Sequence, residues 1–299
     1  MNRDREMYIE IAIKQPFSLT SVVNSHGWVQ LRPFSWVSDT GILRYIDKLP
    51  TGSTAEYEIS ATETGVHVSV LGDENAQERS SIEARVSWML AAEQDMSGFY
   101  KLAAGEPKLN RAVTNVQGRI LRSATVFEDV LKTMLTTNTA WSGTIRMVNT
   151  LIDLYGNPLQ EDAAVCAFPT PTRLANSSEA ELRERARLGY RAPYVLELAR
   201  TVDSGELELE AYKQTTLSTQ ELRTQLLAIK GIGAYAAANL LMLLGRYDYI
   251  PIDSWALKTV SAEWFNGETV NKDQVEQVFE RWGAWRGLVY WFWDYSNDG

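Results

Sequence analysis

One carboxylate and one glycine-rich turn are the residues of this sequence whose spacing could support chemistry. The turn is Gly231-Ile232-Gly233, and Asp253 follows it about twenty residues later, after Pro251. A carboxylate beside a reacting carbon can stabilise developing positive charge or orient a water molecule. Asp253 could instead cap a helix over Trp255–Val260. The two roles are compatible, because an aspartate in such a turn can cap a helix and still face a site.

Two predicted helices hold this turn. Apolar residues recur with helical spacing over Thr219–Ile229, which predicts the first helix. Lys230–Gly233 interrupts it, because glycines permit positive φ and a close approach of the backbone to another group. Alanines and leucines over Ala234–Leu244 predict a second helix, with Gly245 as its stop. Such a turn offers backbone N–H groups to a phosphate. The alternative is an ordinary helical hairpin beside a surface acid.

The composition argues against several kinds of site. The 299 residues allow one large domain or two ordinary ones, and 45% hydrophobic residues can fill a sizeable core. The single cysteine, Cys166, allows neither an internal disulfide nor a four-cysteine iron–sulfur cluster. His26 and His67 are far from the turn, which argues against a histidine-rich metal site or a Ser–His triad there. Without a long apolar run or a signal-peptide pattern, we expect a soluble intracellular protein.

The charge balance is acidic. A net charge of −9 argues against nucleic-acid binding as a general property, although a local basic strip can suffice. The segment Glu181–Arg200 contains five arginines against three glutamates. We therefore expect any affinity for DNA to be weak and sensitive to salt.

The first 80 residues read as strands and the rest as helices. Alternating apolar residues over Tyr8–Ile13, Ala55–Ser60 and Gly65–Val70 predict strands, and Ser18–Asn24 could form a short helix. From about Asn75 the apolar spacing becomes helical. We predict an α+β fold, with a small antiparallel domain over 1–80 and a helical body over 81–299.

The hairpin, Pro251 and Asp253 resemble, in order and spacing, the helix-hairpin-helix (HhH-GPD) superfamily of base-excision DNA glycosylases. Further segments extend the resemblance. Thr136–Thr139 and Leu188–Val195 look like segments of the 8-oxoguanine glycosylases, and Glu280–Arg286 resembles bacterial alkylpurine (3-methyladenine) glycosylase II. The resemblance implies an all-helical glycosylase body of two lobes, with the active-site cleft between them.

The resemblance also implies residue roles. Asp253 matches the catalytic aspartate. Members that also nick the strand carry a lysine two residues after the second glycine, where this chain has Tyr235, and Lys230 before the hairpin does not match that position. Because tyrosine cannot form a Schiff base, we expect a monofunctional enzyme. Tyr235 could line the base pocket, or simply pack within the hairpin.

The remaining expected site residues fall into two groups. The base pocket would contain Tyr235, Asn239, Trp291 and Asp294, although Trp291 could belong to the core. The DNA-binding residues would be Asn138, Tyr190, Arg191, Lys230, Gly231 and Gly233.

In the DNA-binding group, Asn138 would fill the gap left by a flipped base, and Tyr190 and Arg191 would contact the orphaned partner. A plain polar turn and a packed surface arginine are the alternatives. A second arginine and an edge-reading glutamine of the 8-oxoguanine enzymes align with Gly143 and Gly287.

These observations favour excision of an alkylated purine from double-stranded DNA. The alternatives are an 8-oxoguanine glycosylase, a non-catalytic DNA-damage-binding protein, and a helical scaffold unrelated to DNA. We expect no cofactor, although a structural cation at the hairpin is possible. We also expect no membrane partner, a monomer, and a cytoplasmic, nucleoid-associated location in a prokaryote.

Overall fold

The computed structural model describes residues 6–71, 75–160 and 162–294, and its chain forms two compact units. The first unit combines residues up to 94 with 120–214, and the second combines 95–119 with the residues from 215 onward. The predicted division between residues 80 and 81 falls inside helix α2 (Ala76–Met89). Contacts therefore group the chain into discontinuous segments, which a single cut in the sequence does not describe.

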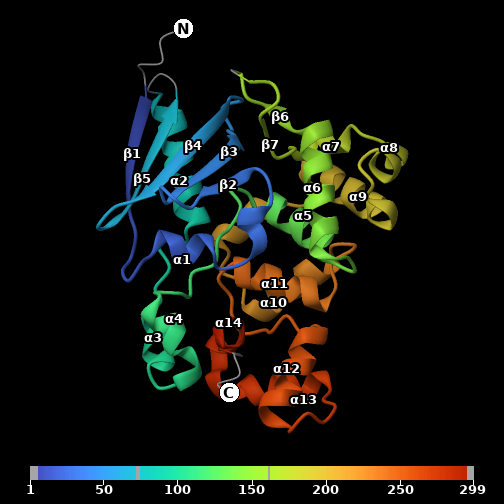
Figure 1. Cartoon of the computed structure of the whole chain (residues 1–299). Helices are drawn as coiled ribbons and strands as arrows, with labels where there is room; N and C mark the ends of the chain where they lie inside the picture. Colours follow the sequence, from blue (N-terminus) through green and yellow to red (C-terminus); the bar gives the residue numbers. More distant parts are fainter. Residues whose placement is uncertain (1–5, 72–74, 161, 295–299) are drawn as a thin grey trace. The chain divides into compact units, whose positions relative to one another are not determined.

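A five-stranded antiparallel sheet forms one side of the first unit (Figure 1). Its order is β1-β5-β4-β3-β2, and Ile9 of β1 lies opposite Val68 of β5. The strands are β1 (Glu6–Ala12), β2 (Phe34–Val37), β3 (Ile42–Lys48), β4 (Thr54–Ala61) and β5 (Gly65–Leu71). Exposed and buried residues alternate strictly along β1, so one face of the strand is buried. Helix α2 packs against β1.

Besides α2, the other helices of the first unit lie between β1 and β2 or follow the sheet in the chain. They are α1 (Leu19–Val23), α5 (Val126–Thr136), α6 (Trp141–Tyr155), α7 (Pro171–Ala175), α8 (Glu179–Glu184) and α9 (Ala192–Asp203), with the short 3-10 helices η1 (Gly27–Gln30), η3 (Gly189–Arg191) and η4 (Leu209–Gln214). A two-stranded pair, β6 (Asn157–Pro158) and β7 (Cys166–Ala167), follows α6. The first ten residues of α5 are all buried, so this helix is the centre of the unit.

Ionic groups are part of the core beside α5. Tyr45 of β3 donates to Glu128 at 2.6 Å, and Lys132 forms a 2.6 Å ion pair with the same carboxylate. The indole of Trp28 donates to Asp129 at 2.7 Å. Because an unpaired buried charge is costly, these pairs define how α5 packs against the sheet.

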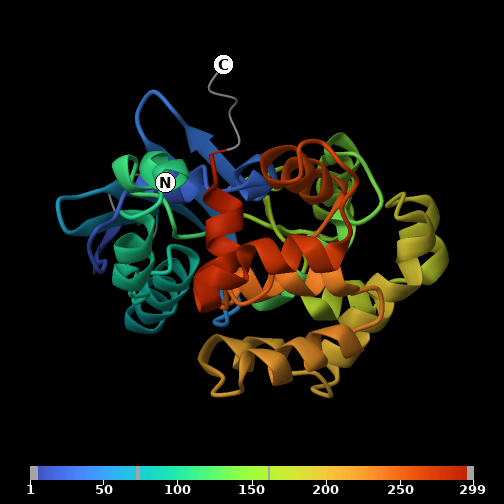
Figure 2. The same cartoon turned by 90° about the horizontal axis from the view of Figure 1, so that it is seen from below.

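The second unit is helical (Figures 1 and 2). Its elements are α3 (Ser97–Ala103), η2 (Pro107–Leu109), α4 (Asn110–Thr114), α10 (Thr219–Ala228), α11 (Ala234–Leu243), α12 (Ser254–Trp264), α13 (Lys272–Phe279), η5 (Glu280–Trp285) and α14 (Arg286–Phe292). The ring of Phe279 lies 5.4 Å from Trp264 and 5.6 Å from Tyr290, both edge to face. Most tryptophans of the C-terminal segment therefore build the core of this unit.

The predicted α+β class is confirmed, with an antiparallel sheet at the N-terminus and a mostly helical remainder. The two helices predicted around the glycine turn are α10 and α11. Within the described residues, no helix has the length and apolar character needed to cross a membrane.

Candidate active site

The glycine hairpin between α10 and α11 presents its backbone to solvent. Gly231 adopts φ +88°, a conformation that L residues rarely take, and Gly233 is the N-cap residue of α11. The amide of Ile232 donates to the carbonyl of Ile229 at 3.0 Å. Ile232 is buried, whereas Lys230 and both glycines are exposed. One apolar side chain thus anchors the turn, and no side chain caps the N-terminus of α11. Such an uncapped N-terminus suits an anion.

Asp253 begins α12. Its Oδ1 accepts the amide of Ala256 at 2.9 Å, so the predicted N-cap role is present. The side chain is nevertheless exposed, and among the described residues no donor contacts its Oδ2. One carboxylate oxygen is fixed by the helix while the other faces solvent. This geometry holds a negative charge in a defined direction without burying it.

Two tyrosines lie within electrostatic reach of this carboxylate. Burial raises the pKa of the Tyr235 hydroxyl, and the charge of Asp253 raises it further, against the opposing effect of a hydrogen bond with Asn239. Burial also raises the pKa of Tyr290 strongly, with further contributions from Asp253 and Tyr235. Both phenols therefore remain protonated at neutral pH and can donate hydrogen bonds.

An exposed tryptophan stands next to these groups. Trp255 lies two residues after Asp253 and is 47% exposed, which is unusual for the largest apolar side chain. Its ring meets Tyr290 edge to face with centroids 6.0 Å apart, and Tyr290 is only 3% exposed. The charge of Asp253 thus acts on a buried tyrosine, whose ring contacts the exposed ring of Trp255.

Sequence reasoning missed Tyr290 and Trp255. Tyr290 belongs to the run Tyr290-Trp291-Phe292-Trp293, in which every residue is aromatic, so composition gives no reason to prefer one of them. The predicted pocket residue Trp291 is half-buried, and the amide of Asp294 donates to the carbonyl of Lys108 at 2.9 Å. Asn239 donates to the carbonyl of Tyr235 at 3.0 Å. Roles for Trp291 and Asp294 in the pocket remain predictions.

Packing explains why residue 287 is a glycine. Its amide donates to the carbonyl of Tyr247, and a Cβ added at this glycine would lie 2.6 Å from the carbonyl oxygen of Tyr249. No side chain fits there without a shift of the backbone. The absence of an edge-reading side chain at Gly287 therefore carries no information about substrate.

The first unit brings together the other three predicted residues. Asn138 follows α5 with φ +48°, and its amide contacts the hydroxyl of Tyr190 at 3.4 Å. The Arg191 guanidinium lies 4.4 Å from the centre of the Tyr190 ring, and it donates to the carbonyl of Thr137. Arg191 is buried, and its Nε has no hydrogen-bond partner. A buried arginine with a free donor is a group prepared for an acceptor.

The predicted basic strip is partly neutralised. Arg183 pairs with Glu179 at 2.5 Å and Arg185 with Glu181 at 3.7 Å, both within or beside α8. Among the described residues, no group of three or more metal-ligating side chains is present. The candidate site residues described for the two units comprise a carboxylate, phenols, aromatic rings, one arginine and backbone amides.

In comparison with known proteins, one family matches about half of the chain. Residues 131–284 match the family described as "HhH-GPD superfamily base excision DNA repair protein". A DNA-3-methyladenine glycosylase of Bacillus subtilis is 21% identical over 204 residues, which are 67% of each chain.

Two solved structures share the fold over nearly the whole chain. A 3-methyladenine DNA-glycosylase from Archaeoglobus fulgidus has a TM-score of 0.72 at 20% identity and covers 96% of this chain and 97% of its own. Clostridium acetobutylicum 8-oxoguanine glycosylase/lyase, solved with double-stranded DNA containing cytosine opposite 8-oxoguanine, has a TM-score of 0.72 at 20% identity, with 99% and 98% covered. The two structures differ in substrate, so the likeness fixes the fold and leaves the lesion open.

Proposed function

Because the chain belongs to the HhH-GPD superfamily of base excision DNA repair proteins, we propose that it is a monofunctional DNA glycosylase that removes alkylated purines from duplex DNA. The observation that carries this proposal is the setting of Asp253. Its carboxylate caps α12 through one oxygen, the residue is exposed, and its charge acts on Tyr290, whose ring contacts that of Trp255.

Asp253 supplies the charge that this reaction needs. Breaking an N-glycosidic bond expels the base and leaves positive charge on the sugar, which a fixed carboxylate stabilises. The same carboxylate can orient the attacking water. The helix cap holds the side chain in place before the substrate arrives, so little reorganisation is required.

The surrounding aromatic residues favour a cationic base. An alkylated purine such as 7-methylguanine carries positive charge and leaves readily, so it needs little general-acid assistance. Aromatic faces attract such a cation. Trp255 offers an exposed ring, and the half-buried Tyr235 carries an uncharged phenol that can contact the base.

The hairpin would hold the DNA backbone. Exposed amides at Gly231 and Gly233, at the uncapped start of α11, suit a phosphate group. Asn138 would fill the space of the flipped base, with Tyr190 and Arg191 at the orphaned partner. The protein would act on double-stranded DNA without a cofactor.

A second candidate, an 8-oxoguanine glycosylase, is favoured by the Asn138–Tyr190–Arg191 cluster. The Arg191 guanidinium lies against the ring of the exposed Tyr190, whose hydroxyl contacts Asn138, so the three residues that this resemblance assigns to the orphaned cytosine and the vacated stack lie together. Tyr235 argues against a strand-nicking member, because it occupies the position where those members carry a lysine.

Incubation with duplexes that each carry one lesion tests the proposal. Half of each sample is treated with alkali, which cleaves abasic sites, and half with borohydride, which traps a Schiff base. We expect strand breaks only after alkali and no trapped adduct. Nicking without alkali together with a trapped adduct would contradict the monofunctional assignment, and the variant Lys230→Ala would then show whether that amine is responsible.

A further inference from the structure

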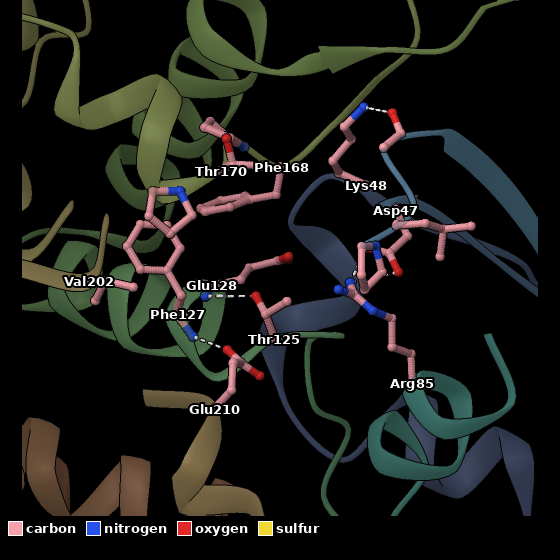
Figure 3. Close-up of a pocket in the computed structure, with 15 residues that line it drawn as sticks. Asp47, Lys48, Arg85, Thr125, Phe127, Glu128, Phe168, Thr170, Val202 and Glu210 are labelled. Carbon is pink, nitrogen blue, oxygen red and sulfur yellow. Dashed lines mark hydrogen bonds and ion pairs between the residues drawn. The ribbon is translucent and has the colours of Figure 1, made fainter. Parts of the chain in front are cut away.

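The first unit contains a cavity of about 430 Å³ that none of the roles above uses (Figure 3). It lies between the end of β3, helix α2, the start of α5, the segment 168–171, α9 and η4. This volume is within the range of small-molecule sites, which run from about 300 to 1,000 Å³.

One wall of the cavity is apolar. Figure 3 shows Phe127, Phe168 and Val202 on the same side, and Pro169 and Pro171 also line the cavity. Phe127 and Phe168 are both buried, so their rings are fixed by the fold. Two fixed aromatic rings and two prolines suit a flat, apolar ligand.

The acidic groups that line the cavity are already paired. Asp47 accepts two hydrogen bonds from Arg85 Nη1, at 2.6 and 2.8 Å, and a third from Tyr57 at 2.8 Å. Glu210 pairs with Lys213 at 2.7 Å and accepts the amide of Phe127 at 3.2 Å. The third carboxylate, Glu128, is held by Lys132 and Tyr45.

Lys48 is the exception among the charged groups that line the cavity. Its ammonium donates to the backbone carbonyl of Gly52, which is neutral, and no carboxylate of the described residues lies within ion-pair distance. Figure 3 shows Lys48 on the same side as Arg85. The cavity therefore combines paired acids with one cation that lacks a counter-charge, so it attracts an anion and disfavours a cation.

We propose that this cavity binds a small organic anion, with a flat aromatic body against Phe127 and Phe168 and a single carboxylate or similar acidic group at Lys48. The apolar wall would supply most of the affinity, and the Lys48 ammonium would favour a negatively charged ligand over a neutral or cationic one. The proposal is independent of the reaction at Asp253.

Three naphthalene probes of the same size test charge selection: 1-naphthoate, neutral 1-naphthamide and cationic 1-naphthylmethylammonium, titrated into the full-length protein by calorimetry. We expect 1-naphthoate to bind, the amide to bind about tenfold more weakly through loss of one charge-assisted hydrogen bond, and the cation not to bind. Equal binding of all three probes, or no binding of 1-naphthoate, would overturn the proposal.

Variants locate the site. Lys48→Gln keeps a donor for the Gly52 carbonyl, and we expect it to weaken 1-naphthoate about tenfold while leaving 1-naphthamide unchanged. Val202→Trp fills the cavity and should weaken both probes. The exposed Lys272→Gln, on α13, is the matched control and should change neither. If Lys48→Gln retains full affinity for 1-naphthoate, any binding occurs elsewhere and the assignment is wrong.

Discussion

Asp253 combines a structural and a chemical role, and the two can be separated by substitution. Asparagine is an equally good N-cap, so Asp253→Asn keeps the hydrogen bond to Ala256 and removes only the charge. We expect base release to fall by about a hundredfold to a thousandfold, or roughly 3–4 kcal/mol, with binding to lesion DNA largely retained. Single-turnover kinetics measures this, with the exposed Asp273→Asn as control. Near-normal release would show that Asp253 is only a cap.

Trp255 tests the aromatic surface beside that carboxylate. Its ring is 47% exposed, so Trp255→Ala should cost little stability. Stacking of a base on an aromatic ring contributes about 1–3 kcal/mol, so we expect kcat/KM on a methylpurine duplex to fall roughly tenfold. Val113→Ala, which also truncates an exposed apolar side chain, serves as control. A variant with unchanged kcat/KM would place Trp255 outside the base contact.

The sequence could not predict which aromatic residue of the segment 290–293 lies near Asp253. The helical hairpin and the cap at Asp253 are encoded by neighbours within a few residues, so spacing alone predicted them. Which ring of residues 290–293 faces Asp253 depends on where α14 begins. That position follows from a non-helical Gly283, at φ +53° and ψ −128°, and from packing of Gly287 on residues 247 and 249. Neither feature has a local signal.

At the scale of elements, the hairpin has two separable properties: a turn that requires a positive φ at Gly231, and an exposed backbone. Gly231 and Gly267 have nearly equal positive φ values, +88° and +85°, but only Gly231 lies between α10 and α11. Alanine at either position should cost about 1 kcal/mol of stability. We expect only Gly231→Ala to lose affinity for undamaged duplex DNA, measured by fluorescence anisotropy. Equal affinities of the two variants would remove the hairpin from the DNA contact.

Helix α5 gives a prediction about pH. Burial raises the pKa of Asp129 to about 6 from 3.8, against the hydrogen bonds from Ser123 and Trp28. Between these values the folded chain holds a proton that the unfolded chain has lost, so stability falls as pH rises. Asp129→Asn keeps an acceptor for both donors and cannot ionise. Its stability relative to wild type should therefore rise by roughly 2–3 kcal/mol from about pH 4 to pH 7.

Urea unfolding at several pH values checks this result, with the exposed Asp39→Asn as control. The comparison with wild type is needed because burial lowers the pKa of His26 to about 4. That shift makes stability fall as pH drops through the same window, and it is common to both proteins. If the difference in unfolding free energy between Asp129→Asn and wild type did not change with pH, burial would not raise the pKa of Asp129.

At the scale of the whole molecule, charge separates this chain from most DNA-binding proteins. The net charge is −9, two arginines of the basic segment are paired within or beside α8, and Arg191 is buried. Few phosphates can therefore be neutralised, so affinity for undamaged DNA should be weak. On the proposed function, recognition would come from the flipped base and its partner, and we expect the specificity to lie in the residues around Asp253 and Arg191.

The central claim is excision of an alkylated purine, and two parallel time courses test it most directly. One follows release of 3-methyladenine and 7-methylguanine from methylated duplex DNA, and the other follows release of 8-oxoguanine opposite cytosine, with Asp253→Asn as the blank in both. We predict faster release of the methylpurines, because the exposed ring of Trp255 attracts a cationic base and Tyr235 replaces the Schiff-base lysine. Efficient release of 8-oxoguanine with the methylpurines retained would contradict the account.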